Sequence, residues 1–274
     1  MPELPEVETT RKGISPYCEH QKVLSVEVRQ PSLRWPVPDN LAQLLEGQVI
    51  RGIQRRAKYL LLAFDHGTLI IHLGMSGSLR VMLQPEPAQK HDHVDITLIT
   101  GHTLRYHDPR RFGAFVWTDQ PVAHHKLIAH LGPEPLSDQF TAQYLSQKCQ
   151  KRKTAIKSLI MDSKVVVGVG NIYANEALFM SGIHPKQLAG QLSEGKISLL
   201  TEKIRFVLQR SITQGGTTLR DFVGGDGKPG YFAQQLNVYG RAGKDCPECG
   251  YQLEEIRQNN RSSVFCARCQ PLQA

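Results

Sequence analysis

The sequence predicts an α+β protein that has an N-terminal helix and β-sandwich, a helical domain, and a zinc-binding β-hairpin at its end. Three observations carry this prediction. Short β-branched and aromatic runs with turns between them occupy the first half of the chain. Helical periodicity dominates after about residue 133, and four of the six cysteines follow residue 245. Because Pro, Gly and Ser gather at 131–137, we expect domains over residues 1–132, 133–236 and 237–274.

The composition indicates a globular chain with a basic excess. The 274 residues suffice for two cores, and 40% hydrophobic against 21% charged residues excludes a disordered chain. The net charge of +8 favours a polyanionic partner such as nucleic acid, although charge alone leaves this open. An acidic, proline-rich start and the lack of a long apolar run argue against a secretory signal and a membrane protein.

Local patterns predict the individual elements. Pro5, with two glutamates close after it, is typical of a first helical turn, and we expect this helix to run to about Gly13. A second clear helix covers 193–214, where apolar residues share one face and two glycines end it. The glycine-rich stretch 215–230 predicts a loop. Strands are expected at residues 23–28, 59–64, 68–72, 94–99 and 115–117.

The C-terminal cysteines predict a metal site. Cys246 and Cys249 form one Cys-x-x-Cys pair, and Cys266 and Cys269 form another after sixteen residues. Two such turns close a tetrahedral shell of four thiolates, which leaves no open position, so the zinc ion would be structural. The alternative is two unrelated redox pairs. Arg261 would lie near the tip of the hairpin between the pairs, where it either meets phosphate or is a solvated loop charge.

The N-terminus offers a candidate nucleophile. Pro2 follows the initiator methionine, whose removal would leave a secondary amine that attacks an aldehydic sugar carbon to give an iminium directly. An α-amino group has a pKa near ~8, so it is more often neutral at pH 7 than lysine, near ~10.4. Glu3 and Glu6 are close enough in sequence to move protons. The alternative is a start codon followed by an ordinary helix cap.

Several motifs together resemble the bacterial formamidopyrimidine-DNA glycosylases, which excise 8-oxoguanine and ring-opened purines. These motifs follow one another in the same order as in the family, and they are spread over nearly the whole chain. They are Pro2-Glu3-Leu4-Pro5-Glu6-Val7-Glu8-Thr9, Gln54-Arg55-Arg56-Ala57-Lys58-Tyr59, His72-Leu73-Gly74-Met75-Ser76-Gly77, Asp108-Pro109-Arg110-Arg111-Phe112-Gly113, Val167-Gly168-Val169-Gly170-Asn171-Ile172-Tyr173-Ala174, and the four-cysteine finger.

This resemblance implies a β-sandwich, a helix-two-turns-helix domain and a zinc finger, with damaged duplex DNA in the cleft between domains. It implies that Pro2 is the nucleophile at C1′ of the damaged nucleotide. Glu3 would be the general acid/base that protonates the deoxyribose ring oxygen, and Glu6 would support the site. Lys58 would contact phosphate beside the lesion. The Pro2 iminium would then drive successive β- and δ-elimination.

The resemblance also assigns DNA contacts. Met75 would fill the vacated base position, Arg110 would hydrogen-bond the orphaned cytosine, and Phe112 would wedge a base step. Without the resemblance, Met75 and Phe112 would be core residues and Arg110 a surface charge. The loop from Thr217 to Tyr231 would close over the extruded base, with Arg220 where many relatives carry lysine. Further DNA contacts would be His91, Lys153, Lys157, Asn171, Tyr239 and Arg261.

Other basic residues, histidines and cysteines give weaker functional indications. Lys153 belongs to a basic cluster at 148–157 that is either a phosphate contact or a solvated helix face. The histidines, among them His91, His93, His124 and His125, do not indicate a second metal site. Cys18 and Cys149 have no assigned role.

Two alternatives remain at this point. The endonuclease VIII branch removes oxidised pyrimidines, but its members usually open with Pro-Glu-Gly-Pro-Glu, and Leu4 stands here in the glycine position. A non-catalytic zinc-ribbon protein that binds damaged duplex would not need the Pro2-Glu3 pair. We therefore expect a monomeric repair enzyme with one structural zinc ion, in the bacterial cytoplasm on the nucleoid, and no membrane partner.

Overall fold

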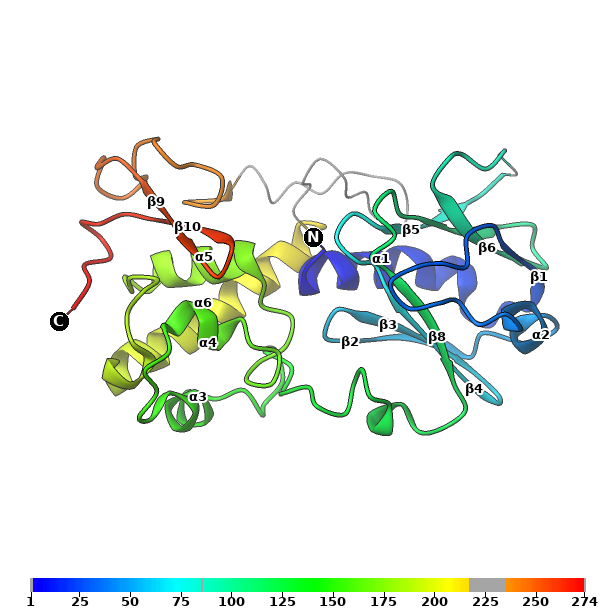
Figure 1. Cartoon of the computed structure of the whole chain (residues 1–274), viewed down its shortest axis with the longest axis horizontal. Coiled ribbons are helices and arrows are strands. Elements are labelled where there is room, and N and C mark those ends of the chain that lie inside the picture. Colours follow the sequence, from blue (N-terminus) through cyan, green and yellow to red (C-terminus); the bar gives the residue numbers. More distant parts are fainter. Residues whose placement is uncertain (1, 85, 217–234, 274) are drawn as a thin grey trace. The chain divides into compact units, whose positions relative to one another are not determined.

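The computed structural model describes residues 2–84, 86–216 and 235–273 of the chain, which form two compact units. Among these residues, the first unit holds everything up to 129 together with 214–216, and the second holds 130–213 and 235–273 (Figure 1). Thr217, Arg220 and Tyr231 lie outside the described residues. No described helix has the length and apolar character needed to cross a bilayer.

The first unit is the predicted β-sandwich, built from two four-stranded antiparallel sheets. One sheet has the order β2-β3-β4-β8 and the other β1-β6-β7-β5. The strands are β1 (Val23–Val28), β2 (Gly52–Arg56), β3 (Tyr59–Phe64), β4 (Gly67–His72), β5 (Ser78–Met82), β6 (Asp92–Leu98), β7 (Thr103–His107) and β8 (Ala114–Thr118).

Alternate residues of these strands form the core between the sheets. Leu60 and Leu62 of β3 are fully buried, and Val94 and Ile96 of β6 are at most 1% exposed. Successive side chains of a strand point to opposite faces, so this alternation directs one face of each sheet inward. The short helices α2 (Leu41–Leu45) and η1 (Val122–His124) complete the unit.

Helix α1 (Leu4–Cys18) is five residues longer than predicted, since it passes Gly13 and carries Pro16 in its last turn. It packs against β2, β3 and β5. The fully buried Ile14 and Cys18 extend the buried face that Leu4 begins. Their burial outweighs the intrinsic cost of glycine and proline in a helix.

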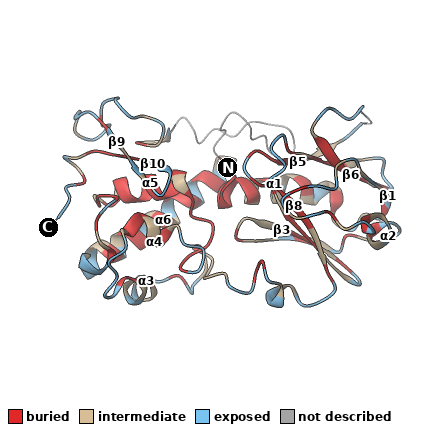
Figure 2. Cartoon of the chain, viewed as in Figure 1, coloured by how far each residue is buried: buried red, intermediate tan, exposed pale blue. Residues whose placement is uncertain are grey.

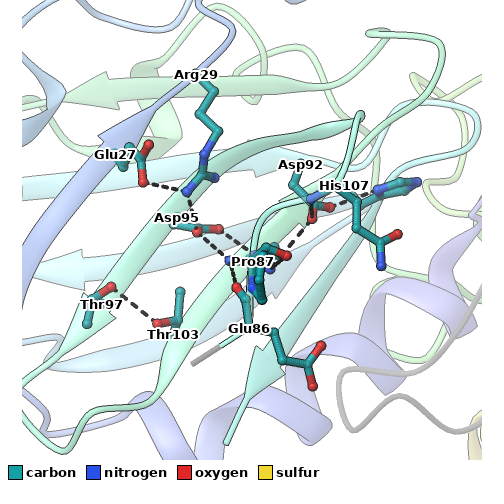
Figure 3. Close-up of polar contacts among 11 residues, drawn as sticks. Glu27, Arg29, Glu86, Pro87, Asp92, Asp95, Thr97, Thr103 and His107 are labelled. Carbon is teal, nitrogen blue, oxygen red and sulfur yellow. Dashed lines mark hydrogen bonds and ion pairs between the residues drawn. The ribbon is translucent and has the colours of Figure 1, made fainter. Parts of the chain in front are cut away.

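A buried polar network covers the outer face of the second sheet (Figure 3). Arg105 binds Asp95 through two hydrogen bonds of 2.9 and 2.8 Å, and its Nη1 lies 3.6 Å from Asp92. Arg29 adds a 2.8 Å contact to Asp95. Burial raises the pKa of Asp95, but its hydrogen bonds to Arg105 and Arg29 and their charges outweigh this, so that pKa lies below its ordinary value. The Asp95 carboxylate therefore stays charged although it is buried.

Replacing Arg105 with methionine is expected to destabilise the first unit by about 3 kcal/mol, because two buried carboxylates would lose their shared cation. Urea unfolding followed by tryptophan fluorescence measures this, since both tryptophans, Trp35 and Trp117, belong to this unit. The difference should shrink below about pH 4, where carboxylates become protonated on unfolding. Arg51→Met removes an exposed pair with Asp65 and should leave the urea midpoint almost unchanged, because solvent screens that pair. An equal loss of unfolding free energy in both variants would contradict the role of Arg105 as the cation of this buried network.

The second unit consists of helices and a β-hairpin. Its elements are α3 (Ala142–Cys149), α4 (Ile156–Ile160), α5 (Asn171–Met180), η2 (Ala189–Gln191), α6 (Glu194–Thr213), β9 (Glu254–Gln258) and β10 (Arg261–Phe265). Figure 2 shows α5 buried along most of its length and α6 buried along one side. The observed α6 lies within one residue of the predicted helix at each end, and its buried face is the predicted one. α4, the turns after it and α5 form the helix-two-turns-helix motif.

Candidate active site and metal centre

The N-terminal residues are held by the start of α1. Glu3 is the N-cap residue, and its backbone N–H donates to Glu6 Oε2 at 2.8 Å. The Glu3 side chain in turn accepts the backbone N–H of Glu6, which completes a capping box. Pro2, Glu3 and Glu6 are all buried. The capping box therefore sets the position of the residue next to Pro2, which is a physical reason for the supporting role predicted for Glu6.

Lys58 lies in the two-residue turn between β2 and β3, where Ala57 has a φ of 55°. Arg55 connects this turn to α1: its Nη1 donates to Ala57 O at 2.9 Å and its Nε to Glu8 Oε2 at 3.0 Å. The left-handed conformation of a non-glycine residue is costly, and such strain is typical of functional turns. The turn that holds Lys58 and the helix that follows Pro2 are thus linked through one arginine.

His72 lies beside Lys58 and stays neutral. The centre of its ring lies 5.0 Å from that of Tyr59, with the two rings tilted by 52°, and its Nδ1 accepts the backbone N–H of Gly74 at 3.0 Å. Burial, and next the positive charge of Lys58, lower the pKa of His72 to about 4. At neutral pH, His72 therefore adds no positive charge beside the Lys58 ammonium.

The structure brings Met75, Arg110 and Phe112 together, as the resemblance predicts. Met75 is 41% exposed and Phe112 40%, so neither is a core residue. The Arg110 guanidinium lies 4.8 Å from the centre of the Phe112 ring. The three line one open hollow of about 640 Å³ with Leu33, Arg34 and others. Two exposed large apolar side chains flanked by arginines form a surface that suits nucleic acid.

His91 lies at the edge of the polar network of the second sheet. Its ring is 5.8 Å from that of His107, which bonds Asp92 at 2.9 Å (Figure 3). Desolvation, and next the charge of Lys90, lower the pKa of His91. Among the described residues, the group of three or more potential ligands that could hold a metal is the cysteine cluster.

Predicted DNA contacts of the second unit lie at element ends. Asn171 is the first residue of α5, where helix N–H groups are unsatisfied and the dipole favours anions. Arg261 is exposed at the start of β10, directly after a turn formed by Asn259 and Asn260. Lys153 is exposed ahead of α4. These side chains share one unit, separate from the unit of Pro2 and Lys58.

Three buried polar side chains hydrogen-bond the helices to the hairpin and to the segment at 237–239. The sequence analysis did not predict these contacts. Lys157 of α4 donates to Ser262 O at 2.8 Å and Ser263 Oγ at 2.6 Å, so its ammonium holds the hairpin. Asn175 Oδ1 accepts the N–H of Val264 at 2.8 Å. Glu176 accepts the backbone N–H groups of residues 237, 238 and 239, at 2.8 to 2.9 Å, and so fixes the backbone of Tyr239. The available signal was polar side chains inside otherwise apolar helices, such as the adjacent Asn175 and Glu176 of α5.

The four cysteines converge as predicted. Their sulfurs lie within 4.8 Å of one another, with 3.8 Å between Cys246 and Cys269 and 3.5 Å between Cys249 and Cys266. Zinc–thiolate bonds of about 2.3 Å in a tetrahedron require sulfur separations of about 3.8 Å, so the residues fit zinc. A hydrogen bond from the Tyr251 backbone lowers the pKa of Cys249 to about 7, whereas burial raises the pKa of Cys266 and Cys269. Cys18 and Cys149 are buried elsewhere, and burial raises the pKa of both thiols.

Family models match three segments of the chain. Residues 1–115 match the formamidopyrimidine-DNA glycosylase N-terminal domain, and 131–223 match the H2TH domain of the same glycosylases. Residues 243–272 match a zinc finger found in FPG and IleRS. The three matches follow the order of the sandwich, the helices and the cysteine hairpin.

Similar whole proteins and structures agree with these matches. Proteins named formamidopyrimidine-DNA glycosylase from Photobacterium profundum and Teredinibacter turnerae are 58% and 59% identical, over 98% of this chain and 100% of theirs. A structure of Lactococcus lactis Fpg with DNA containing an abasic site has a TM-score of 0.91 at 36% identity, covering 98% of this chain and 99% of the other. A MutM structure with DNA containing carbocyclic 8-oxo-G has a TM-score of 0.90 at 36% identity, covering 98% and 100%. The chain belongs to the formamidopyrimidine-DNA glycosylase family.

Proposed function

We propose that this protein is a base-excision repair enzyme that removes 8-oxoguanine and formamidopyrimidines from duplex DNA and then cleaves the strand. The observation that carries the proposal is the combination, within one unit, of a capped Pro2-Glu3 start and the exposed Met75, Arg110 and Phe112 cluster. Family membership and relatives solved with lesion-containing DNA support it.

The chemistry follows from a secondary amine beside a carboxyl group. The Pro2 nitrogen bonds to C1′ and loses its proton as the damaged base leaves with the glycosidic electron pair. Glu3 then gives a proton to the deoxyribose ring oxygen as the C1′–O4′ bond breaks, and the lone pair of the Pro2 nitrogen forms the C=N bond to C1′. The resulting iminium acidifies the C2′ protons. Loss of one expels the 3′ phosphate by β-elimination, and δ-elimination then expels the 5′ phosphate. Lys58 holds the phosphate beside the lesion.

The remaining predicted residues would hold the duplex. Met75, Arg110 and Phe112 occupy the stack after the base is extruded, at an unstacking cost of a few kcal/mol. His91, Lys153, Asn171, Tyr239 and Arg261 contact the backbone, so affinity should fall with salt. Thr217, Arg220 and Tyr231 belong to the loop proposed to cover the extruded base.

The proposal includes three domains with the bounds predicted above, one zinc ion, a monomer, and a place on the bacterial nucleoid. The bacterial origin of the relatives supports that location. The alternative of a pyrimidine-specific enzyme is less favoured, because the exposed methionine, arginine and phenylalanine of the purine branch lie together here. Comparing excision of 8-oxoguanine paired with cytosine against thymine glycol separates the two branches.

Borohydride trapping tests the catalytic proposal. The full-length protein incubated with an abasic duplex and borohydride should become covalently linked, because reduction fixes the iminium, and mass spectrometry should locate the link at Pro2. The matched control is the same chain with its initiator methionine retained, which has no free proline nitrogen and should not be trapped. Trapping at a lysine, or full activity with the methionine retained, would refute the role of Pro2.

A further inference from the structure

The carboxylate of Asp108 joins the two turns that carry the exposed cluster. Asp108 follows β7 directly and is completely buried. Its Oδ1 accepts from Ser76 Oγ and from the Arg110 backbone N–H, both at 3.2 Å. Its Oδ2 accepts from the Tyr106 hydroxyl and from the Gly113 backbone N–H, both at 2.9 Å. All four donors are neutral groups, and together they give both oxygens of this buried side chain hydrogen bonds from several directions.

These donors adjoin the three residues of the cluster. Ser76 follows Met75, the Arg110 N–H belongs to the cluster itself, and Gly113 follows Phe112. One carboxylate therefore connects the turn after β4 with the turn between β7 and β8. Burial, and next the charge of Asp108 and the hydrogen bond to it, raise the pKa of Tyr106, so its hydroxyl remains a donor.

The two turns are also packed closely and strained. Gly74 has a φ of +69°, and a Cβ there would lie 2.6 Å from the carbonyl carbon of Phe112. A Cβ on Gly113 would lie 1.6 Å from the Tyr106 hydroxyl. Arg111 has a φ of 56°, which a non-glycine residue adopts only when its surroundings hold it there. The Asp108 backbone adds to this hold, since its carbonyl accepts the Arg111 N–H at 3.2 Å.

We propose that Asp108 is a positioning residue that fixes Met75, Arg110 and Phe112 as one preformed wedge before the duplex is bound. The inference rests on the proposed function, because it assumes that this cluster enters the base stack. A preformed wedge saves the entropy of ordering two loops on binding, so its loss should weaken binding where a stack must be filled. Where there is no stack, as in single-stranded DNA, the wedge has nothing to fill.

The test uses Asp108→Asn in the full-length zinc-loaded protein. Hydroxyl groups can reverse their hydrogen bonds, but backbone N–H groups cannot. Since each carboxylate oxygen accepts one backbone N–H, the asparagine must point its amide N–H₂ at either Arg110 or Gly113. The Kd for a duplex containing tetrahydrofuran, a stable abasic analogue, should rise by about 10- to 100-fold. The Kd for the same analogue in a single strand should stay unchanged.

Two further variants make the result decisive. Asp95→Asn alters a buried aspartate of β6 whose contacts do not include the cluster, so it should destabilise the unit without changing the ratio of the two Kd values. Ser76→Ala removes a single hydroxyl donor and should raise the duplex Kd by about threefold. If Asp108→Asn does not fold, the duplex and single-strand Kd values of Ser76→Ala provide the test.

The outcomes are separable from those of the catalytic proposal. Equal loss of affinity for duplex and single strand, or no loss for either, would overturn the role of Asp108. These arms require no chemistry, so they hold whether or not the wild-type protein is trapped by borohydride. Failure of trapping would refute the catalytic proposal alone.

Discussion

Replacing Glu3 with glutamine should reduce excision of 8-oxoguanine by about 10³-fold while leaving cleavage of a preformed abasic site largely intact. Glutamine has nearly the same shape, and its amide oxygen can still accept the Glu6 backbone N–H, so the capping box that orients Pro2 is kept. What is lost is the proton for the deoxyribose ring oxygen. An abasic sugar opens to its aldehyde without that proton, so Pro2 can still form the iminium.

Single-turnover assays on the two substrates measure this separation. The matched control is Glu6→Gln, which alters the other member of the capping box. Because Glu6 acts through the position of its neighbours, its replacement should reduce both activities by the same factor. If Glu3→Gln also reduces both activities equally, Glu3 is a structural cap and does not supply the proton.

The sequence predicted the elements whose pattern is local. β1 and β3 were predicted at their observed bounds, and α6 to within one residue, because β-branched and aromatic runs mark the strands and a 3.6-residue period marks the helix. β2, β5 and β7 were missed. β2 and β7 contain arginines that are partly or fully buried through ion pairs, such as Arg105, and a pattern of hydrophobicity does not register a buried charge whose partner is distant in sequence.

In the candidate site, too, the sequence predicted what has a local pattern and missed the contacts that only the fold creates. Pro2, Glu3, Lys58 and the exposed cluster came from motifs, because a motif records which residue types the chemistry needs. The residues that hold them were not predicted: Asp108 connects to Ser76, and Glu176 to residues 237–239, only once the chain is folded. Buried polar residues in an apolar context, as in α5, are the one local sign of such connections.

Removing zinc should abolish tight DNA binding without unfolding the sandwich. The hairpin has only a small core of its own, which includes Cys246, Leu253, Val264 and Cys266, so it depends on the metal. Structural zinc contributes about 10 kcal/mol or more to the folding of such modules. Without it, Arg261 loses its place at the start of β10, and the hydrogen bonds of Lys157 to that strand lose their acceptors. Affinity for an abasic duplex should fall by about 100-fold or more, with a smaller salt dependence, because phosphate contacts are lost.

Cys266→Ser and chelation should act alike, whereas Cys149→Ser, a buried thiol of α3 outside the cluster, should keep both zinc and affinity. Zinc content, Kd at several salt concentrations and tryptophan fluorescence together decide the matter. Since Trp35 and Trp117 both lie in the first unit, their unfolding transition should be unchanged after chelation if the metal serves the second unit alone. A transition shifted by chelation would show that zinc also stabilises the sandwich, and undiminished affinity would exclude the hairpin from the DNA contact surface.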